Sequence, residues 1–129
     1  MGERAGRILL AEDDRFLRRA AEATLRQRGL TVVTAVDGEE ALRLARTEVP
    51  DLILLDLIMP KLQGFEVLRA LKQDPATAHI PVIVLSNLGQ AQDVQRTMEG
   101  GAVAYFVKAN LSLQALANRV EEVLAGGKR

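Results

Sequence analysis

The chain of 129 residues carries 17 Lys and Arg against 17 Asp and Glu, and its 48% hydrophobic and 26% charged residues are typical of a globular domain. The balanced charge argues against direct binding of nucleic acid or of an anionic membrane, and the lack of cysteine excludes disulfides and thiolate metal sites. No apolar run approaches the ~20 residues that cross a bilayer, so we expect one cytoplasmic domain over residues 1–129, with a core at 7–124 and flexible ends at 1–6 and 125–129.

The hydrophobic pattern predicts short apolar runs that alternate with amphipathic stretches at helical spacing. The predicted strands, in chain order, are 7–11, 30–36, 52–55, 81–85 and 103–107. The predicted helices, in the same order, are 15–28, 38–49, 64–73, 90–99 and 111–124. The run 52–55 has four consecutive apolar residues flanked by acids, which is typical of a strand buried on both faces. The segment 30–36 interleaves β-branched residues with threonines, as suits an edge strand.

Particular residues punctuate these predicted elements. Asp14 and Asp37 are expected only as helix caps, and Gly29 as a helix stop. The apolar spacing places Phe16 among the inward positions of the first helix and Met98 in the core, while the arginines of the first helix are expected on a solvated face. The lone histidine, His79, is expected on the surface.

Five strands alternating with five helices imply an α/β fold, in which a parallel sheet is covered by helices on both faces. All strands of such a sheet end at the same edge, and binding sites form there. Polar or charged residues directly follow four of the five apolar runs. They are Glu12 and Asp13, then Asp56, then Ser86, then Lys108. We therefore expect three carboxylates, one hydroxyl and one ammonium around a single crevice.

Carboxylates gathered in this way repel each other, which favours protonation or a bound cation. Oxygen ligands without neighbouring His or Cys favour Mg²⁺, Mn²⁺ or Ca²⁺. A hydroxyl and an ammonium opposite such a cation would complete a shell for a phosphoryl group. One carboxylate then becomes a candidate nucleophile that forms an acyl phosphate, and Asp56, at the end of the central apolar run, is the best placed.

The ordered set Glu12-Asp13, Asp56-Leu57-Ile58-Met59-Pro60, Gly64, Ser86, Tyr105 and Lys108 resembles the receiver domain of bacterial two-component response regulators. The resemblance covers residues 7–124. It implies the flavodoxin-like three-layer fold with strand order 2-1-3-4-5, which periodicity alone leaves undetermined.

The resemblance also implies a role for each residue of the set. Asp56 would be the phospho-acceptor and also a ligand of Mg²⁺ (Mn²⁺ as the alternative). The other ligands would be Asp13 directly, Glu12 through water and the backbone carbonyl of Ile58. Ser86 would bond the attached phosphoryl group and Lys108 would pair with it. Tyr105 would be the aromatic switch residue. The phosphoryl donor would be a phosphohistidine on a sensor histidine kinase or a phosphotransfer protein, and the fourth helix, last strand and last helix would form the switched surface.

Three positions depart from the family pattern. Ala109 follows Lys108 where the family usually has proline after a cis bond, which leaves the aim of the lysine open. Asn87 is larger than the small residue common after the hydroxyl, and Gln63 replaces a frequent Asp. Ile58 and Leu88 are apolar at positions that influence how water reaches the phosphoryl group, so we expect slow self-dephosphorylation.

Three alternatives compete with this reading. An aspartyl-phosphate phosphatase would carry a second Asp where Ile58 stands, and a flavin-binding carrier would need a phosphate-binding loop where Glu12-Asp13-Asp14 stands. A pseudo-receiver would keep the fold without the chemistry. We expect a signalling protein rather than an enzyme, with no output domain in this chain. It would act through an unidentified downstream protein or as part of a longer protein, and a homodimer remains open.

Overall fold

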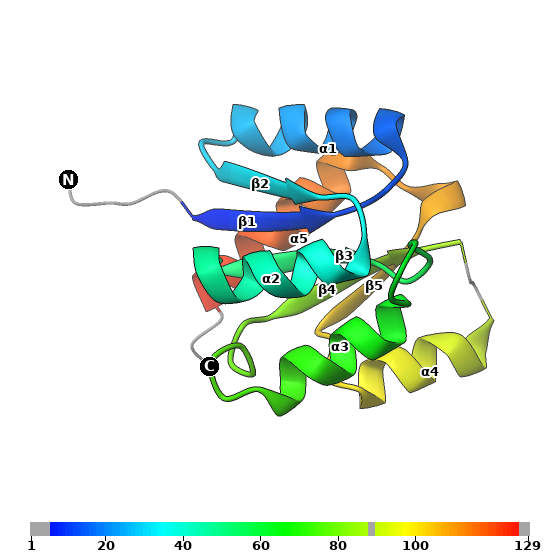
Figure 1. Ribbon diagram of the computed structural model, residues 1–129. Helices are drawn as coiled ribbons and strands as arrows, with labels where there is room; N and C mark the ends of the chain where they lie inside the picture. The colour runs from blue at the N-terminus through cyan, green and yellow to red at the C-terminus, as the bar shows by residue number, and fades with distance from the viewer. Residues whose placement is uncertain (1–5, 88–89, 127–129) are drawn as a thin grey trace.

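The computed structural model describes residues 6–87 and 90–126, in which strands and helices alternate along the chain (Figure 1). The strands are β1 (Arg7–Ala11), β2 (Thr31–Ala35), β3 (Leu52–Asp56), β4 (Val82–Ser86) and β5 (Ala104–Val107). The helices are α1 (Arg15–Gln27), α2 (Gly38–Glu48), α3 (Gly64–Gln73), α4 (Ala91–Glu99) and α5 (Leu113–Gly126), with a short 3₁₀ helix at Lys108–Asn110. The order of elements expected from the sequence is confirmed.

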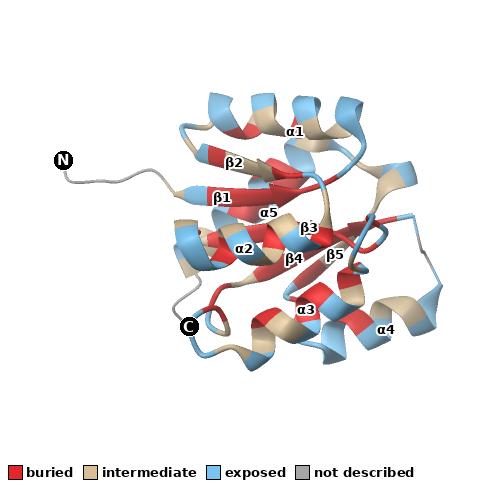
Figure 2. Ribbon diagram, viewed as in Figure 1, coloured by how far each residue is buried: buried red, intermediate tan, exposed pale blue. Residues whose placement is uncertain are grey.

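The strands form one parallel sheet in the order β2-β1-β3-β4-β5, which is the flavodoxin-like arrangement that the resemblance implied. All residues of β3 and β4 are buried, whereas β2 at one edge is partly exposed. Figure 2 shows this burial as a continuous band along the middle of the molecule. The continuous apolar run of β3 is therefore explained by helices on both of its faces.

Successive side chains of each strand point to opposite faces of the sheet, and each face has its own core. Leu10 and Leu54 pack on the side of α1 and α5, with Leu25 and Leu116. Leu55 packs on the other side, where α2 and α3 contribute most of the helical core. At about 25 cal/mol per Å² of buried apolar surface, these two cores are the main source of stability.

Local chemistry explains where the helices begin. The Asp14 carboxylate accepts hydrogen bonds from the backbone N–H groups of Phe16 and Leu17, which have no partner inside α1. Asp37 caps α2 in the same way through the N–H of Glu40. Both acids act as helix caps, as the sequence predicts.

The structure corrects two predictions about the core. Phe16 is 86% exposed, because the stripe of α1 that faces the sheet runs through Leu17 and Ala21 and leaves Phe16 on the flank. Met98 is 41% exposed, and Thr97 takes the inward position of α4 instead. The Thr97 hydroxyl donates to the Asp93 carbonyl at 2.8 Å, so its burial leaves no polar atom without a partner.

The chain ends differ slightly from the expectation. Helix α5 continues to Gly126, two residues past the predicted core limit at 124. The predicted flexible ends otherwise fall on residues 1–5 and 127–129, which lie outside the described residues, as does Leu88. The peptide bond between Lys108 and Ala109 is trans. Within the described residues, no helix has the length and apolar character needed to cross a membrane.

Candidate functional site

The carboxyl ends of β1, β3 and β5 bring three charged side chains to the same edge of the sheet. Asp56 is the last residue of β3, Glu12 directly follows β1 and Lys108 directly follows β5. The alternation along these strands puts all three on the face that packs against α1 and α5, because Leu10, Leu54 and Phe106, two residues earlier, belong to that core. Register and pleat together therefore make the three side chains converge.

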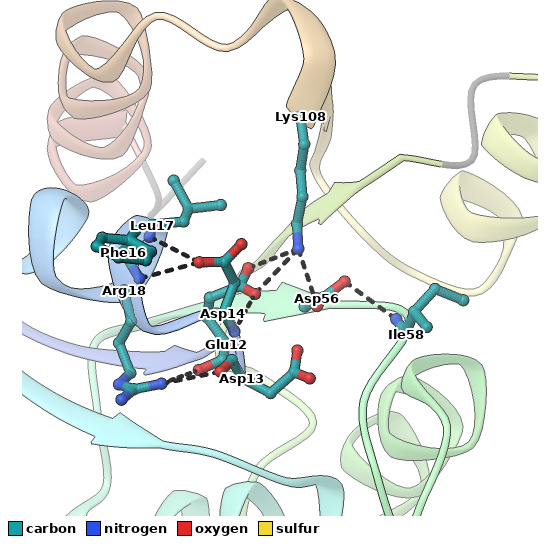
Figure 3. Close-up of polar contacts among 9 residues, drawn as sticks. All are labelled: Glu12, Asp13, Asp14, Phe16, Leu17, Arg18, Asp56, Ile58 and Lys108. Atoms are coloured by element: carbon teal, nitrogen blue, oxygen red, sulfur yellow. Dashed lines mark hydrogen bonds and ion pairs between the residues drawn. The ribbon is translucent and has the colours of Figure 1, made fainter.

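Lys108 is the centre of this convergence (Figure 3). Its ammonium lies 3.0 Å from Asp56 Oδ2, 2.9 Å from Glu12 Oε1 and 3.0 Å from Glu12 Oε2. The Glu12 and Asp56 side chains are 0% and 2% exposed and that of Lys108 is 15% exposed. The trans bond to Ala109 therefore still lets the lysine reach both carboxylates.

Burial dominates the electrostatics of these acids. It raises the pKa of Glu12 to about 7, against the opposing hydrogen bonds from Lys108 and from the Asp14 N–H. Burial also raises the pKa of Asp56, although the Ile58 N–H and Lys108 act in the opposite direction. Burial disfavours the charged form of Lys108, but its bonds to the two acids outweigh burial and its pKa is raised. The ammonium therefore stays charged and stabilises the two carboxylates only in part.

Asp13 adds a third carboxylate to the cluster. One oxygen from each of Glu12, Asp13 and Asp56 lies within 4.8 Å of the others, and Asp13 is exposed to solvent. With all groups ionised, three carboxylates and one ammonium leave a formal charge of −2. Glu12 Oε1 is buried and has the ion-pair contact with Lys108 but no hydrogen bond. An oxygen-only set with a net double negative charge and access to water fits Mg²⁺ or Mn²⁺.

The loop between β1 and α1 holds the acids by backbone contacts. The Asp14 N–H donates to Glu12 Oε2 at 2.9 Å. Arg18, from the first turns of α1, donates from Nη1 to the Glu12 carbonyl at 3.0 Å and to the Asp13 carbonyl at 3.2 Å. The expectation that all arginines of this helix lie on a solvated face is therefore wrong for Arg18. No spacing in the sequence indicates this contact, because the two acceptors are backbone carbonyls of the turn before the helix.

The loop after β3 presents Asp56 from the other side. The Ile58 N–H donates to Asp56 Oδ1 at 3.0 Å, so each Asp56 oxygen has one donor. The Ile58 side chain is 56% exposed beside the site. Lys61 has φ of 72°, and Gly38 lies so close to the Leu62 backbone that no side chain fits there. This loop is thus packed against the start of α2 by backbone contacts.

Ser86 and Tyr105 lie on the opposite face of the sheet from Asp56. Ser86 is fully buried at the end of β4, and Tyr105 is half-buried on β5 against the core of the α2 and α3 side. Burial raises the pKa of Tyr105, and a hydrogen bond with Ser86 acts against that shift. The two residues expected to switch together are therefore already in contact. Asn87 and Gln63 are both exposed, and His79 is on the surface as predicted.

The flavodoxin-like sheet with an acidic cluster at its carboxyl edge defines a class of small α/β domains. The chain matches the family model described as "Response regulator receiver domain" over residues 8–121, and it belongs to that family. It is 42% identical over 117 residues to the "Gliding motility regulatory protein" of Myxococcus xanthus, an alignment that covers 91% of this chain and 15% of that protein. The chain spans 15% of the length of that relative and 52% of the length of the "Transcriptional regulatory protein AfsQ1" of Streptomyces coelicolor, to which it is 39% identical over 122 residues.

Solved structures agree with this assignment. The signal receiver domain of a signal transduction histidine kinase from Syntrophus aciditrophicus superposes with a TM-score of 0.87 at 35% identity, over 97% of this chain and 94% of that one. The Mn²⁺-bound form of response regulator Rcp1 superposes with a TM-score of 0.78 at 31% identity, over 92% and 91% of the two chains. The family match and these superpositions together identify the chain as a response regulator receiver domain, a family of signalling proteins.

Proposed function

We propose that Asp56 accepts a phosphoryl group from a phosphohistidine on a sensor histidine kinase or a phosphotransfer protein. The observation that carries this proposal is the buried Asp56 carboxylate, positioned by Lys108 and the Ile58 N–H beside two further carboxylates. In the transfer, an Asp56 oxygen forms a bond to phosphorus while the bond between phosphorus and the imidazole nitrogen breaks. The electron pair of that bond returns to the imidazole, and Asp56 becomes an acyl phosphate.

Mg²⁺, or Mn²⁺ in its place, is the cofactor in this proposal. Asp13 and Asp56 would hold it directly, Glu12 through water, and the Ile58 carbonyl would be a further ligand. When bound, the cation neutralises the charge that develops on the phosphoryl oxygens. The oxygen-only donor set and the Mn²⁺-bound form of the related Rcp1 support this choice.

Three residues would respond to the new phosphoryl group. Lys108, which now bridges Glu12 and Asp56, would transfer one of its contacts to a phosphoryl oxygen. Ser86, at the same carboxyl edge of the sheet but now on the opposite face, would turn toward the phosphoryl group to bond another oxygen, and Tyr105, its present partner, would move with it. Both lie on strands next to α4, so the surface formed by α4, β5 and α5 would change for a downstream partner.

The chain would be a phospho-acceptor and not an enzyme for other substrates. Residues 1–129 would act as one receiver domain, whatever protein it belongs to. Because sensor kinases make phosphohistidine from ATP, the location would be cytoplasmic. The switched surface would act on a downstream protein or on an output domain of the same protein, and neither nucleic acid nor a membrane is expected to bind directly.

The test is phosphorylation by phosphoramidate, whose P–N bond resembles that of phosphohistidine. Wild type, Asp56→Asn and Asp51→Asn would be incubated with the reagent and Mg²⁺ and measured by intact mass. The matched control is Asp51, an aspartate just before the first residue of β3 and therefore at the opposite edge of the sheet. Its carboxylate accepts a hydrogen bond from the Arg7 N–H at 2.8 Å. We expect one added phosphoryl group on wild type and Asp51→Asn, none on Asp56→Asn, and none when EDTA removes the cation. A wild type that stays unmodified would indicate a pseudo-receiver instead.

A further inference from the structure

Arg18 makes an unusual contact for a residue on the outer helix layer. Its side chain leaves the second turn of α1 and folds back over the loop that carries the acids (Figure 3). A single nitrogen, Nη1, donates to the carbonyl oxygens of two consecutive residues, Glu12 at 3.0 Å and Asp13 at 3.2 Å. The Arg18 N–H meanwhile donates to the Asp14 carbonyl at 2.9 Å, as a regular helix requires. The guanidinium thus ties the end of β1 to the beginning of α1.

These two carbonyls determine where the Asp13 side chain points. The peptide planes on either side of the Asp13 Cα are rigid, so φ and ψ of Asp13 are the only soft backbone angles between them. Fixing the direction of both carbonyls fixes φ and ψ, and with them the direction of the Cα–Cβ bond. In Figure 3 no dashed line reaches the Asp13 carboxylate, so none of the other residues drawn there holds it by a hydrogen bond. The backbone therefore sets the position of the Asp13 Cβ and thus which χ1 rotamers bring the carboxylate to the cluster, whereas hydrogen bonds hold the Glu12 and Asp56 carboxylates directly.

We propose that Arg18 is a positioning residue that aims the Asp13 carboxylate at the site of the divalent cation. This inference rests on the proposed function, because it assumes that the acidic cluster binds Mg²⁺ or Mn²⁺. Arg18 would not touch the cation or the phosphoryl group. It would act only through the two carbonyls and the backbone of Asp13.

The charge and the geometry of Arg18 have opposite consequences, which makes the proposal testable. A guanidinium near the cluster repels a cation, so an effect of charge alone predicts that removing Arg18 strengthens cation binding. An effect on position predicts weaker binding, because residues that orient metal ligands are worth about 10–100-fold in metal affinity. The sign of the change separates the two.

The experiment measures Mn²⁺ affinity by the electron paramagnetic resonance signal of free Mn²⁺, for wild type, Arg18→Met, Arg18→Lys and Arg19→Met. Arg19 is the next residue of α1, carries the same charge and is exposed, so it is the control for charge. We expect Arg18→Met to bind about 10–100-fold more weakly and Arg19→Met to bind as wild type or slightly more tightly. Arg18→Lys keeps the charge but has a shorter donor, and should lie between wild type and Arg18→Met.

Two further measurements separate this role from a loss of folding. Urea unfolding in EDTA would show whether each variant is folded at the temperature of the binding assay. If Arg18→Met is unfolded there, the Mn²⁺ affinity of Arg18→Lys tests the inference instead, because that variant keeps the charge of wild type. In phosphoramidate reactions, the Mg²⁺ concentration for half-maximal rate should rise in the Arg18 variants while the rate at saturating Mg²⁺ changes little. Equal or tighter Mn²⁺ binding by folded Arg18 variants would overturn the inference. A wild type that binds no Mn²⁺ would instead overturn the metal site of the proposed function, and this inference with it.

Discussion

Replacing Gly64 by alanine tests whether close backbone packing holds the loop that presents Asp56. Gly64 is the first residue of α3, and a Cβ there would lie 2.3 Å from the Leu57 Cα and 2.7 Å from the Asp56 carbonyl oxygen. Both atoms belong to the backbone at the end of β3, so no side-chain rotation relieves the contact. The Gly64 N–H also donates to the Leu57 carbonyl at 2.8 Å, which keeps the two segments in contact.

The expected cost follows from these distances. Ordinary contacts of a Cβ lie between 3.4 and 4 Å, so the start of α3 must withdraw by more than an ångström. Overpacking of this kind costs about 1–3 kcal/mol, and weakening the hydrogen bond to Leu57 adds about 1 kcal/mol. The better helix propensity of alanine offsets up to about 1 kcal/mol. We expect Gly64→Ala to lower the free energy of unfolding by about 1–4 kcal/mol.

The assay is urea unfolding followed by far-UV circular dichroism, with Gly126→Ala as the control. Gly126 is also a helical glycine, but a Cβ there meets nothing within 4 Å. Its replacement should leave stability unchanged or raise it by up to about 1 kcal/mol. The reasoning would be refuted if Gly64→Ala were as stable as wild type, because backbone contact would then not be what holds α3 to the end of β3.

Two shorter predictions concern the site, and a third concerns the loop that leads into β4. Ile58→Asn should shorten the lifetime of the acyl phosphate about tenfold, because the new amide can orient the water that attacks phosphorus. The lifetime is measured by loss of the added mass, and a wild-type lifetime of seconds, unchanged by the substitution, would contradict this. Lys108→Met should tighten Mn²⁺ binding by about tenfold, because a repelling charge is removed, yet reduce phosphorylation in the phosphoramidate assay. Lys72→Met should cost about 1–2 kcal/mol in urea unfolding, because the lysine donates to the carbonyls of Ala78 and Ile80 at 3.1 and 2.9 Å.

Strand-ending residues were predictable from the sequence because parallel strands end at one edge of a sheet. Asp56 and Lys108 are 52 positions apart, and only the alternation of apolar runs and helices relates them. Helix faces were harder to predict, because hydropathy alone does not identify the stripe that meets the sheet. Met98 is more hydrophobic than Thr97, yet Thr97 takes the inward position of α4, and the bond from its hydroxyl to the Asp93 carbonyl removes the cost of burying it.

Arg18 shows why part of the site could not be predicted in this way. A sequence pattern assigns a residue to a face of a helix, and on that basis an arginine between apolar positions belongs to the solvent. The guanidinium, however, ends several bonds from the helix and can reach groups beyond the helix terminus. What it reaches depends on which carbonyls the strand-to-helix turn leaves without a partner, and that is a property of the folded backbone. The carboxylates that define the chemistry are thus visible in the sequence, whereas the residues that aim them become visible only when the loop conformation is known.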